Sequence, residues 1–254
     1  MGANNDPSIL TKYLKDRSGS QGGRNFNREL YNKVSVHPNS NVNSSVLNDE
    51  FSVLFRNKNS SVRNIVSKGQ LNHSEIDQII KNSLIYPGSG PGHLLRDLEK
   101  MLNQNPQGIN HILGNIKTPN RSNFLGAEWV LRYICDGANP QRLRGLSRLE
   151  LPTAGGSRIY DAVINGIRYE FKNLQTFNSS GFMTQIAKDF RNDPTLSSVR
   201  WIYSSRVGDK ADLIAQMRQS LRNRSLLSAN NLTRAQGRSI IAELDNFVDV
   251  GIKL

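Results

Sequence analysis

The chain has 254 residues and a formal charge of +12, which leaves room for one large domain or two modest ones. This charge and the pI of about 10.0 favour a polyanionic partner, either a nucleic acid or an anionic membrane surface. The single cysteine excludes an internal disulfide, and the four scattered histidines lack the paired spacing of common zinc sites. A metal site would therefore need oxygen ligands.

The first residues, MGANNDPSIL, do not combine a charged start with an apolar run, so they do not resemble a signal peptide. No stretch approaches the ~18 apolar residues that a membrane-spanning helix needs. The hydrophobic share is 37% and the mean hydropathy is −0.51, which indicates that part of the chain forms loops. We expect a soluble protein without a membrane span.

In the first half, the segments 18–25 and 37–45 are rich in Gly, Ser and Asn, so we expect few long elements there. Apolar spacing predicts helices over 73–84 and 93–104, the first with a capping pattern of Ser74 and Asp77.

The segment YPGSGPG between these helices has neither G-x-G-x-x-G nor a Walker lysine, which predicts a loop rather than a phosphate cradle.

A linker is predicted over 117–123, where Pro119 lies among polar turn formers. It divides a polar, mainly helical domain, 1–118, from a second domain, 119–254. Helices of the second domain are predicted over 124–134, 181–190, 211–224 and 232–244, and strands over 142–151, 158–164, 166–174 and 199–205, with one more short strand in the tail. This order predicts an α/β (α+β) domain with a small mixed sheet.

Asn165-Gly166 between two alternating runs predicts a two-residue hairpin turn, because both positions of a type I′ turn need φ > 0. The turn fixes the register, so that Ile164 faces Ile167 and Asp161 faces Glu170. One face of the hairpin is then apolar and forms the core.

The other face opposes the carboxylates of Asp161 and Glu170, with Lys172 on the same face. Like charges so placed need a raised pKa, a neighbouring cation or a bound metal ion. A surface cluster of Lys172 with the two acids is the simpler alternative. A third acid, Glu128, lies in the helix predicted before the strands, where a surface pair with Arg132 could equally explain it.

This arrangement resembles the PD-(D/E)XK nuclease superfamily, whose members have a restriction-endonuclease-like fold. The likeness covers about half of the chain, and the matching residues are Glu128, Asp161 and Glu170-Phe171-Lys172, with Gln185 where several members carry a helper glutamine. Tyr160 stands where the motif's name has proline.

The resemblance implies metal-dependent hydrolysis of phosphodiester bonds. Asp161, Glu170, the backbone carbonyl of Phe171 and Glu128 would hold Mg²⁺ or Mn²⁺, with Zn²⁺ less suited to these hard oxygen ligands. Lys172 would orient the nucleophilic water or balance charge on the phosphate, and Gln185 would hydrogen-bond near them.

From residue 121 onward the chain has 15 Arg and 4 Lys, and arginine matches phosphate oxygens best. Candidate contacts to a nucleic-acid backbone are Arg142, Arg144, Arg148, Arg168, Arg218 and Arg222. A solvated basic face is the alternative for at least half of them. Trp129, Trp201 and Cys135 are predicted to be buried. All histidines precede residue 119, which excludes a histidine-based mechanism within the second domain.

A narrower resemblance links the chain to nuclease toxins of contact-dependent growth inhibition and other polymorphic toxin systems, which join a polar entry domain to a basic nuclease domain. It implies export from the producing bacterium, action in the target-cell cytoplasm and a cognate immunity protein. DNA is slightly favoured as the substrate over tRNA. A restriction or repair nuclease and a non-catalytic nucleic-acid-binding protein remain the alternatives.

Overall fold

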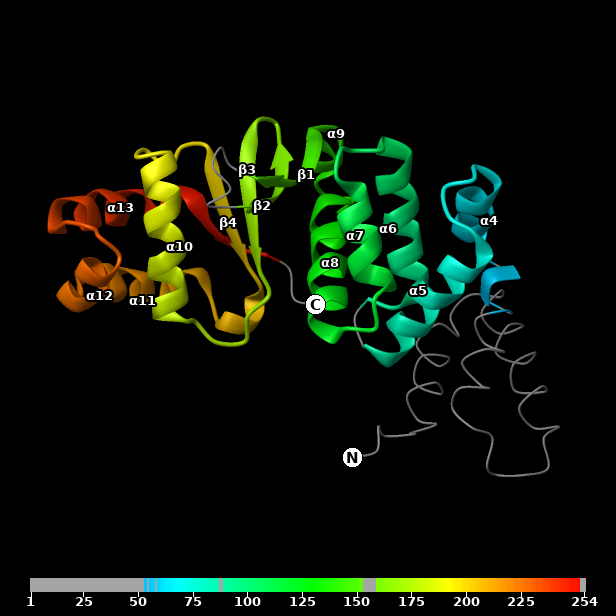
Figure 1. Cartoon of the computed structure of the whole chain (residues 1–254), viewed down its shortest axis with the longest axis horizontal. Coiled ribbons are helices and arrows are strands. Elements are labelled where there is room, and N and C mark those ends of the chain that lie inside the picture. The colour runs from blue at the N-terminus through cyan, green and yellow to red at the C-terminus, as the bar shows by residue number, and fades with distance from the viewer. Residues whose placement is uncertain (1–52, 54, 58, 87–88, 153–158, 252–254) are drawn as a thin grey trace, which may run out of the picture. The chain divides into compact units, whose positions relative to one another are not determined.

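A computed structural model describes residues 53, 55–57, 59–86, 89–152 and 159–251, and Figure 1 shows their elements. The predictions for 18–25 and 37–45 lie outside the described residues. The chain divides into two compact units, Met1–Glu99 and Lys100–Leu254. The division falls inside helix α6 (Pro91–Gln104). No helix in the described part of the chain has the length and apolar character to cross a membrane.

The described part of the first unit contains α4 (Ser60–Ser67), α5 (His73–Ile85) and the first turns of α6. The predicted cap of α5 is wrong. The Asn72 side chain accepts from the Glu75 N–H at 3.0 Å, and the Glu75 carboxylate accepts from the Asn72 N–H at 2.9 Å. This reciprocal pair satisfies two of the amides that a helix start leaves unbonded. Asp77 instead forms an ion pair with Arg56 at 2.6 Å.

In the second unit, two helices precede the sheet, α7 (Ile109–Lys117) and α8 (Arg121–Ile134). Helix α7 was not predicted. The predicted linker reduces to a turn between the two helices, because the Asn120 side chain accepts from the Asn123 N–H at 3.1 Å and starts α8 early. The proposed boundary after residue 118 thus lies within the second unit, and its functional meaning stays a prediction.

Five strands form one sheet in the order β1-β2-β3-β4-β5. Their bounds are β1 (Leu146–Pro152), β2 (Ile159–Ile164), β3 (Ile167–Lys172), β4 (Val199–Tyr203) and β5 (Val248–Val250). The first three strands pair antiparallel, whereas β4 and β5 pair parallel to their neighbours. The predicted α/β class with a mixed sheet is confirmed. A restriction-endonuclease-like core stays a prediction.

The remaining helices follow the predicted order, with α10 (Ser179–Asn192) between β3 and β4. After β4 come α11 (Lys210–Arg222), α12 (Arg224–Ala229) and α13 (Arg234–Phe247). The strand predicted over 142–151 is partly wrong, since α9 (Pro140–Arg144) occupies its start. Pro140 provides a fixed φ at the first helical position, and β1 begins only after Gly145.

The hairpin has the predicted turn. Asn165 and Gly166 have φ values of 52° and 77°, and the pairs Ile164↔Ile167, Val163↔Arg168 and Ala162↔Tyr169 are in register. The Asn165 N–H also donates to the Gly145 carbonyl at 2.8 Å, which ties the turn to the start of β1. A local sequence signal therefore sets the position of the residues that lead into the candidate site.

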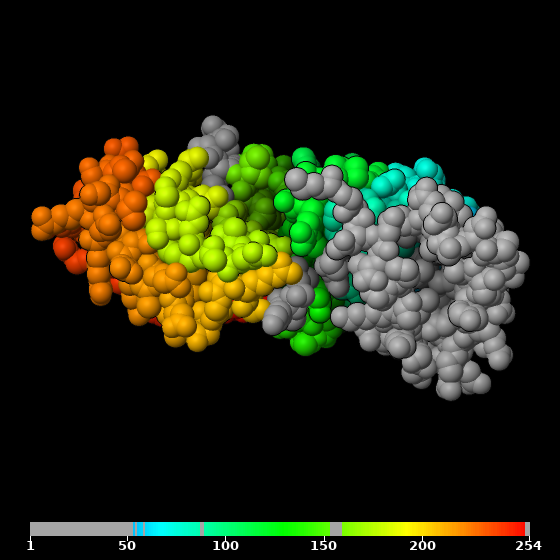
Figure 2. Space-filling model, turned by 90° about the horizontal axis from the view of Figure 1, so that it is seen from below, coloured from blue at the N-terminus to red at the C-terminus, as the bar shows by residue number. Residues whose placement is uncertain are grey.

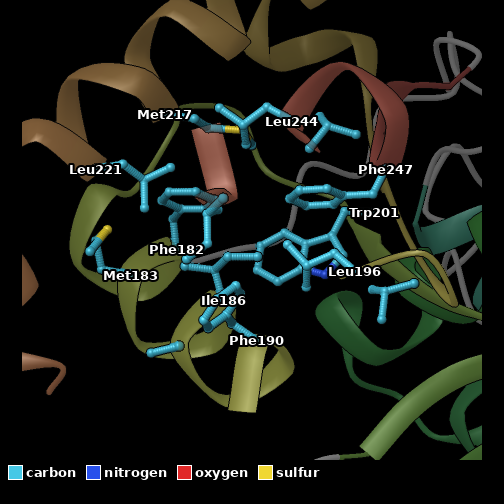
Figure 3. Packing of buried hydrophobic residues seen from close by; sticks show 14 of the residues in the cluster. Phe182, Met183, Ile186, Phe190, Leu196, Trp201, Met217, Leu221, Leu244 and Phe247 are labelled. Atoms are coloured by element: carbon cyan, nitrogen blue, oxygen red, sulfur yellow. The ribbon is translucent and has the colours of Figure 1, made fainter. Parts of the chain in front are cut away.

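Both faces of the sheet are covered. The apolar face of the hairpin is part of a core, as predicted, with Ala162 and Ile164 buried, and the opposite face is covered as well, which was not predicted. On one face, the Phe171 ring lies 5.6 Å from Trp129 and 5.0 Å from Tyr133, both of α8. On the other face, side chains of α10, α11 and α13 pack around Trp201 of β4, as Figure 3 shows. Trp129, Trp201 and Cys135 are buried, as predicted.

A buried carboxylate joins α10 to the second face. Asp189 accepts from the Tyr160 hydroxyl at 2.8 Å and from the Trp201 indole N–H at 2.8 Å. Tyr160 thus lies on the α10 face, although strict alternation predicts the face of Ala162. Two strong donors to one buried acid hold β2 and β4 at fixed positions relative to α10.

The approach of α7 to β1 depends on Gly108, which has a φ of 87°. A Cβ atom there would lie 2.2 Å from the Leu149 carbonyl oxygen. The Leu149 N–H donates to the Gln107 carbonyl at 2.8 Å, so the backbones are in direct contact. Only glycine allows this approach without displacing β1.

We therefore expect Gly108→Ala to lower the free energy of unfolding by more than about 1 kcal/mol, because it adds both a steric clash and an unfavourable φ. Gly114→Ala, within the helix that Gly108 precedes, is the control. A Cβ at 114 meets nothing within 4 Å, so this variant should be neutral or up to about 1 kcal/mol more stable. Denaturant unfolding measures both, and equal effects would contradict the role assigned to Gly108.

Candidate active site

The candidate site begins where the β2–β3 ladder ends. In a two-residue hairpin, Ile164 and Ile167 exchange backbone hydrogen bonds, as does every second pair after them, so Tyr160 and Phe171 should form the third bonded pair. The observed pairing stops at Ala162↔Tyr169. The Phe171 N–H instead donates to Oδ2 of Asp161 at 2.6 Å. The Asp161 side chain thus replaces a backbone carbonyl in the ladder.

The use of a side-chain oxygen in place of a backbone carbonyl explains two departures from the predicted hairpin. Asp161 and Glu170 are not ladder partners, although their carboxylates still interact. Tyr160, released from pairing with β3, turns towards Asp189 on the other face.

The Asp161 carboxyl group is held in an unfavourable environment for its charge. The pKa of Asp161 is raised to about 8, chiefly by burial and then by the negative charge of Glu170, with a smaller contribution from Glu150, while the Phe171 N–H and Lys172 oppose the rise. Glu170 itself is only 6% exposed. Buried acids that repel each other are a common feature of sites that bind cations or transfer protons.

Glu150 of β1 is a third acid at this place, and sequence reasoning missed it. Its pKa is raised by burial and by the charge of Glu170, and lowered by His111. Its φ is 52°, a left-handed conformation that a residue with a side chain seldom adopts. In the sequence Glu150 appears as the polar position of an alternating strand, so only this backbone conformation distinguishes it.

The position of His111 overturns the prediction that no histidine belongs to the domain with the sheet. It lies in the first turn of α7, which contacts β1 through Gln107 and Leu149, and its charge acts on Glu150. The exclusion of histidine chemistry rested on a boundary after residue 118. Because the second unit begins at Lys100, an exposed histidine is present beside the sheet.

Lys172 forms an ion pair with Oε1 of Glu170. Its Nζ lies 5.5 Å from the centre of the Trp201 ring, which is itself fixed by Asp189. The side chain of Lys172 is 13% exposed, so this ammonium group is largely removed from bulk water. The predicted proximity of Lys172 to the acids is thus present, with Glu170 as its partner.

Glu128 lies in α8 as predicted and is 1% exposed, so a surface pair with Arg132 does not describe it. The interactions described above connect Asp161 and Glu170 with Glu150 and Lys172. The approach of Glu128 to that cluster stays a prediction.

Gln185 lies in α10, one helical turn before Asp189 and therefore on the same side of the helix. Helix α10 connects two parallel strands, so it runs antiparallel to them, and Gln185 lies nearer than Asp189 to the carboxyl ends of β3 and β4. Lys172 is the last residue of β3. The fold thus brings Gln185 towards the level of Lys172, and a contact between them stays a prediction.

The donor chemistry fits Mg²⁺, which prefers carboxylate and carbonyl oxygens. The Lys172 carbonyl accepts from the Ser204 N–H of the chain after β4, at 3.0 Å, so the preceding carbonyl, that of Phe171, points towards β2 and Asp161. Within the described ranges, no group of three or more His, Cys, Asp or Glu side chains is already placed to hold a metal ion.

The six candidate arginines differ in their surroundings. Arg142 lies 3.8 Å from the centre of the Tyr133 ring and 3.5 Å from an Asp136 oxygen. Arg168 contacts Ser198 and lies 3.6 Å from Asp193. These two arginines have internal partners, which favours a structural role.

The other four arginines are more exposed to solvent or have fewer interactions with other side chains. Arg218 forms an exposed ion pair with Asp245 at 2.7 Å, and Arg148 is half-buried in β1. Arg144 and Arg222 are exposed and remain the clearest candidates for phosphate contacts.

Comparison with known proteins adds no assignment, since no family model, curated protein or solved structure matches this chain.

The position of Asp161 generates a prediction about stability. An acid whose pKa is about 4 when unfolded and about 8 when folded takes up a proton on folding between these values, so stability falls as pH rises through that window. Asp161→Asn keeps an oxygen for the Phe171 N–H and carries no charge. The difference in melting temperature between this variant and the wild type, measured in EDTA, should therefore increase in favour of the variant as pH rises. At pH 8 the variant should melt at least about 2–4 °C higher.

Asp249→Asn is the control, because Asp249 is an exposed acid of β5. Its melting temperature should follow the wild type at every pH. A constant difference between Asp161→Asn and the wild type from pH 4 to pH 8 would contradict the environment assigned to Asp161.

Proposed function

We propose that this chain is a metal-dependent phosphodiesterase that cleaves nucleic acid. The observation that carries the proposal is the position of Asp161 at the end of the β2–β3 ladder, where the charges of Glu170 and Glu150 act on it. Lys172 forms an ion pair with Glu170 at the same place. A carboxylate is costly at such a place unless a cation or a proton compensates it. The net charge of +12 supports a polyanionic substrate.

Asp161 and Glu170, with the Phe171 carbonyl, would hold a divalent cation, and Glu150 or Glu128 would complete its ligands. A bound Mg²⁺ supplies Lewis acidity towards a phosphoryl oxygen and lowers the pKa of a water molecule. Lys172 contributes a fixed positive charge in a partly dehydrated setting, where it stabilises negative charge on the phosphate more than it would in water. Gln185 can donate a hydrogen bond to a phosphate oxygen or orient a water molecule.

The Glu170–Lys172 ion pair also fits a second function, that of a nucleic-acid-binding protein without catalysis. In that case Lys172 neutralises Glu170 permanently and no metal ion is needed. The proton on Asp161 would then be a structural feature. The two functions differ in their response to Mg²⁺, which cleavage requires and binding does not.

Action as an exported antibacterial toxin, with an immunity protein as partner, remains part of the proposal. It rests on the narrower resemblance and on the basic character of the second unit.

Plasmid DNA and total tRNA incubated with the protein should be cut in Mg²⁺ and remain intact in EDTA. Asp161→Asn, Glu170→Gln and Lys172→Met should each lower the cleavage rate by about 10²-fold or more, because each removes a charge that acts directly on the reacting phosphate or its cation. Asp249→Asn should cut at the wild-type rate. Cleavage that survives Asp161→Asn, or that proceeds in EDTA, would overturn the proposal.

The third acid can be identified by comparing Glu150→Gln with Glu128→Gln at increasing Mg²⁺ concentration. If Glu150 completes the metal ligands, Glu150→Gln should raise the Mg²⁺ concentration for half-maximal rate about tenfold or more, while Glu128→Gln changes it little. The reverse result would return this role to Glu128. Circular dichroism checks that both variants are folded, since Glu128 is buried.

A further inference from the structure

The arginines at the C-terminal end of the second unit form a surface of their own. Between residues 213 and 242 the chain has five arginines and no lysine or acidic residue. Arg222, Arg224, Arg234 and Arg238 are exposed, whereas Arg218 is paired with Asp245. The four exposed residues are called the arginine end below.

Helix packing brings these residues together. A Cβ atom on Gly237 of α13 would lie 2.9 Å from the Leu221 carbonyl oxygen of α11 and 3.1 Å from a methyl group of Leu227 in α12. The C-terminus of α11, the short α12 and the first turns of α13 therefore meet at Gly237. Arg222 follows Leu221, and Arg238 follows Gly237, so both lie at this junction.

The acidic residues lie at the opposite end of the same helices. Lys210, the first residue of α11, donates to the Asp245 carbonyl at 3.2 Å and lies 3.9 Å from an Asp249 oxygen, so α11 and α13 run antiparallel. Their acids, Asp209, Asp212, Glu243 and Asp245, gather where α11 starts and α13 ends. One end of the three helices thus carries exposed arginines without acids, whereas the acids at the other end have Lys210 and Arg218 beside them. Figure 2 shows the outer surface of α11 and α12 in orange.

The charges of α13 are also opposed to its own dipole. Arg234 is its first residue, no acid lies in its first turn and no basic residue lies in its last turn, which contains Asp245. Helix stability favours the reverse order, with acids at the start and bases at the end. The ion pair with Arg218 accounts for Asp245, but helix stability does not explain the arginines at the start of α13, whereas binding of an anion there does.

We propose that the arginine end binds the phosphodiester backbone of a nucleic acid, at a surface separate from the acidic cluster around Asp161. The inference adds an anchoring surface to the proposed function, and binding there does not depend on cleavage. Exposed guanidinium groups on three adjacent helix ends suit several consecutive phosphates, with no requirement for base sequence.

The test uses the full chain in EDTA with a fluorescein-labelled 30-bp DNA duplex and labelled tRNA, measured by anisotropy at several salt concentrations. Arg234→Glu/Arg238→Glu should weaken binding of at least one probe about tenfold or more and lower the slope of log Kd against log salt by about 2. Its melting temperature should equal or exceed that of the wild type, because the new acids match the dipole of α13. A residue with a merely structural role would instead lower it.

Arg63→Glu/Arg121→Glu is the matched control. It makes the same change in net charge at exposed helical positions, and Arg121, like Arg234, is the first residue of its helix. Equal loss of binding in both double variants, or no loss in either, would overturn the proposal.

The proposal would also be overturned if Arg234→Glu/Arg238→Glu lost binding to phosphatidylserine vesicles while its binding to nucleic acid was unchanged. The two proposals can fail separately. If Arg234→Glu/Arg238→Glu loses binding, the anchoring role of the arginine end is supported even when no cleavage is found. If binding is unchanged while the protein cleaves in Mg²⁺, only the anchoring role is refuted.

Discussion

The hydrogen bond from the Phe171 N–H to the Asp161 carboxylate organises the candidate site. It takes the place of the bonded pair between Tyr160 and Phe171, so the β2–β3 pairing stops at Ala162 and Tyr169 although both strands continue. It also holds the acid between the two strands. Tyr160 is released from the ladder by the same change and reaches Asp189, which also binds Trp201. One side chain in place of a backbone carbonyl thus links the ladder, the acids and the α10 face of the core.

Much of the second unit could be predicted because its signals are local. Asn165-Gly166 determines the turn, and from the turn the register follows as far as Ala162 and Tyr169. The prediction failed at the next pair, because alternation assumes that backbone groups bond only to backbone groups. Asp161 violates this assumption, and no pattern of apolar residues can show that a carboxylate will take the place of a carbonyl.

The omissions at the site have a non-local cause. Glu150 becomes part of the acidic cluster through a left-handed backbone at one position of β1, and His111 approaches it because Gly108 lets α7 contact β1. Both depend on contacts between segments about forty residues apart in the sequence. The helix acid selected from the sequence, Glu128, was correctly assigned to a helix, and its burial excludes the simplest alternative, a surface pair.

The location of the division between the two compact units has a practical meaning for expressing fragments. Glu99 and Lys100 are consecutive residues of one continuous helix, α6, rather than of a flexible connection. Lys100 donates to the Cys135 carbonyl at 3.0 Å, and Met101 is fully buried. A truncated protein that starts at residue 100 would begin inside α6 and lack its first turns, so a start at Pro91, where that helix begins, is the sounder choice.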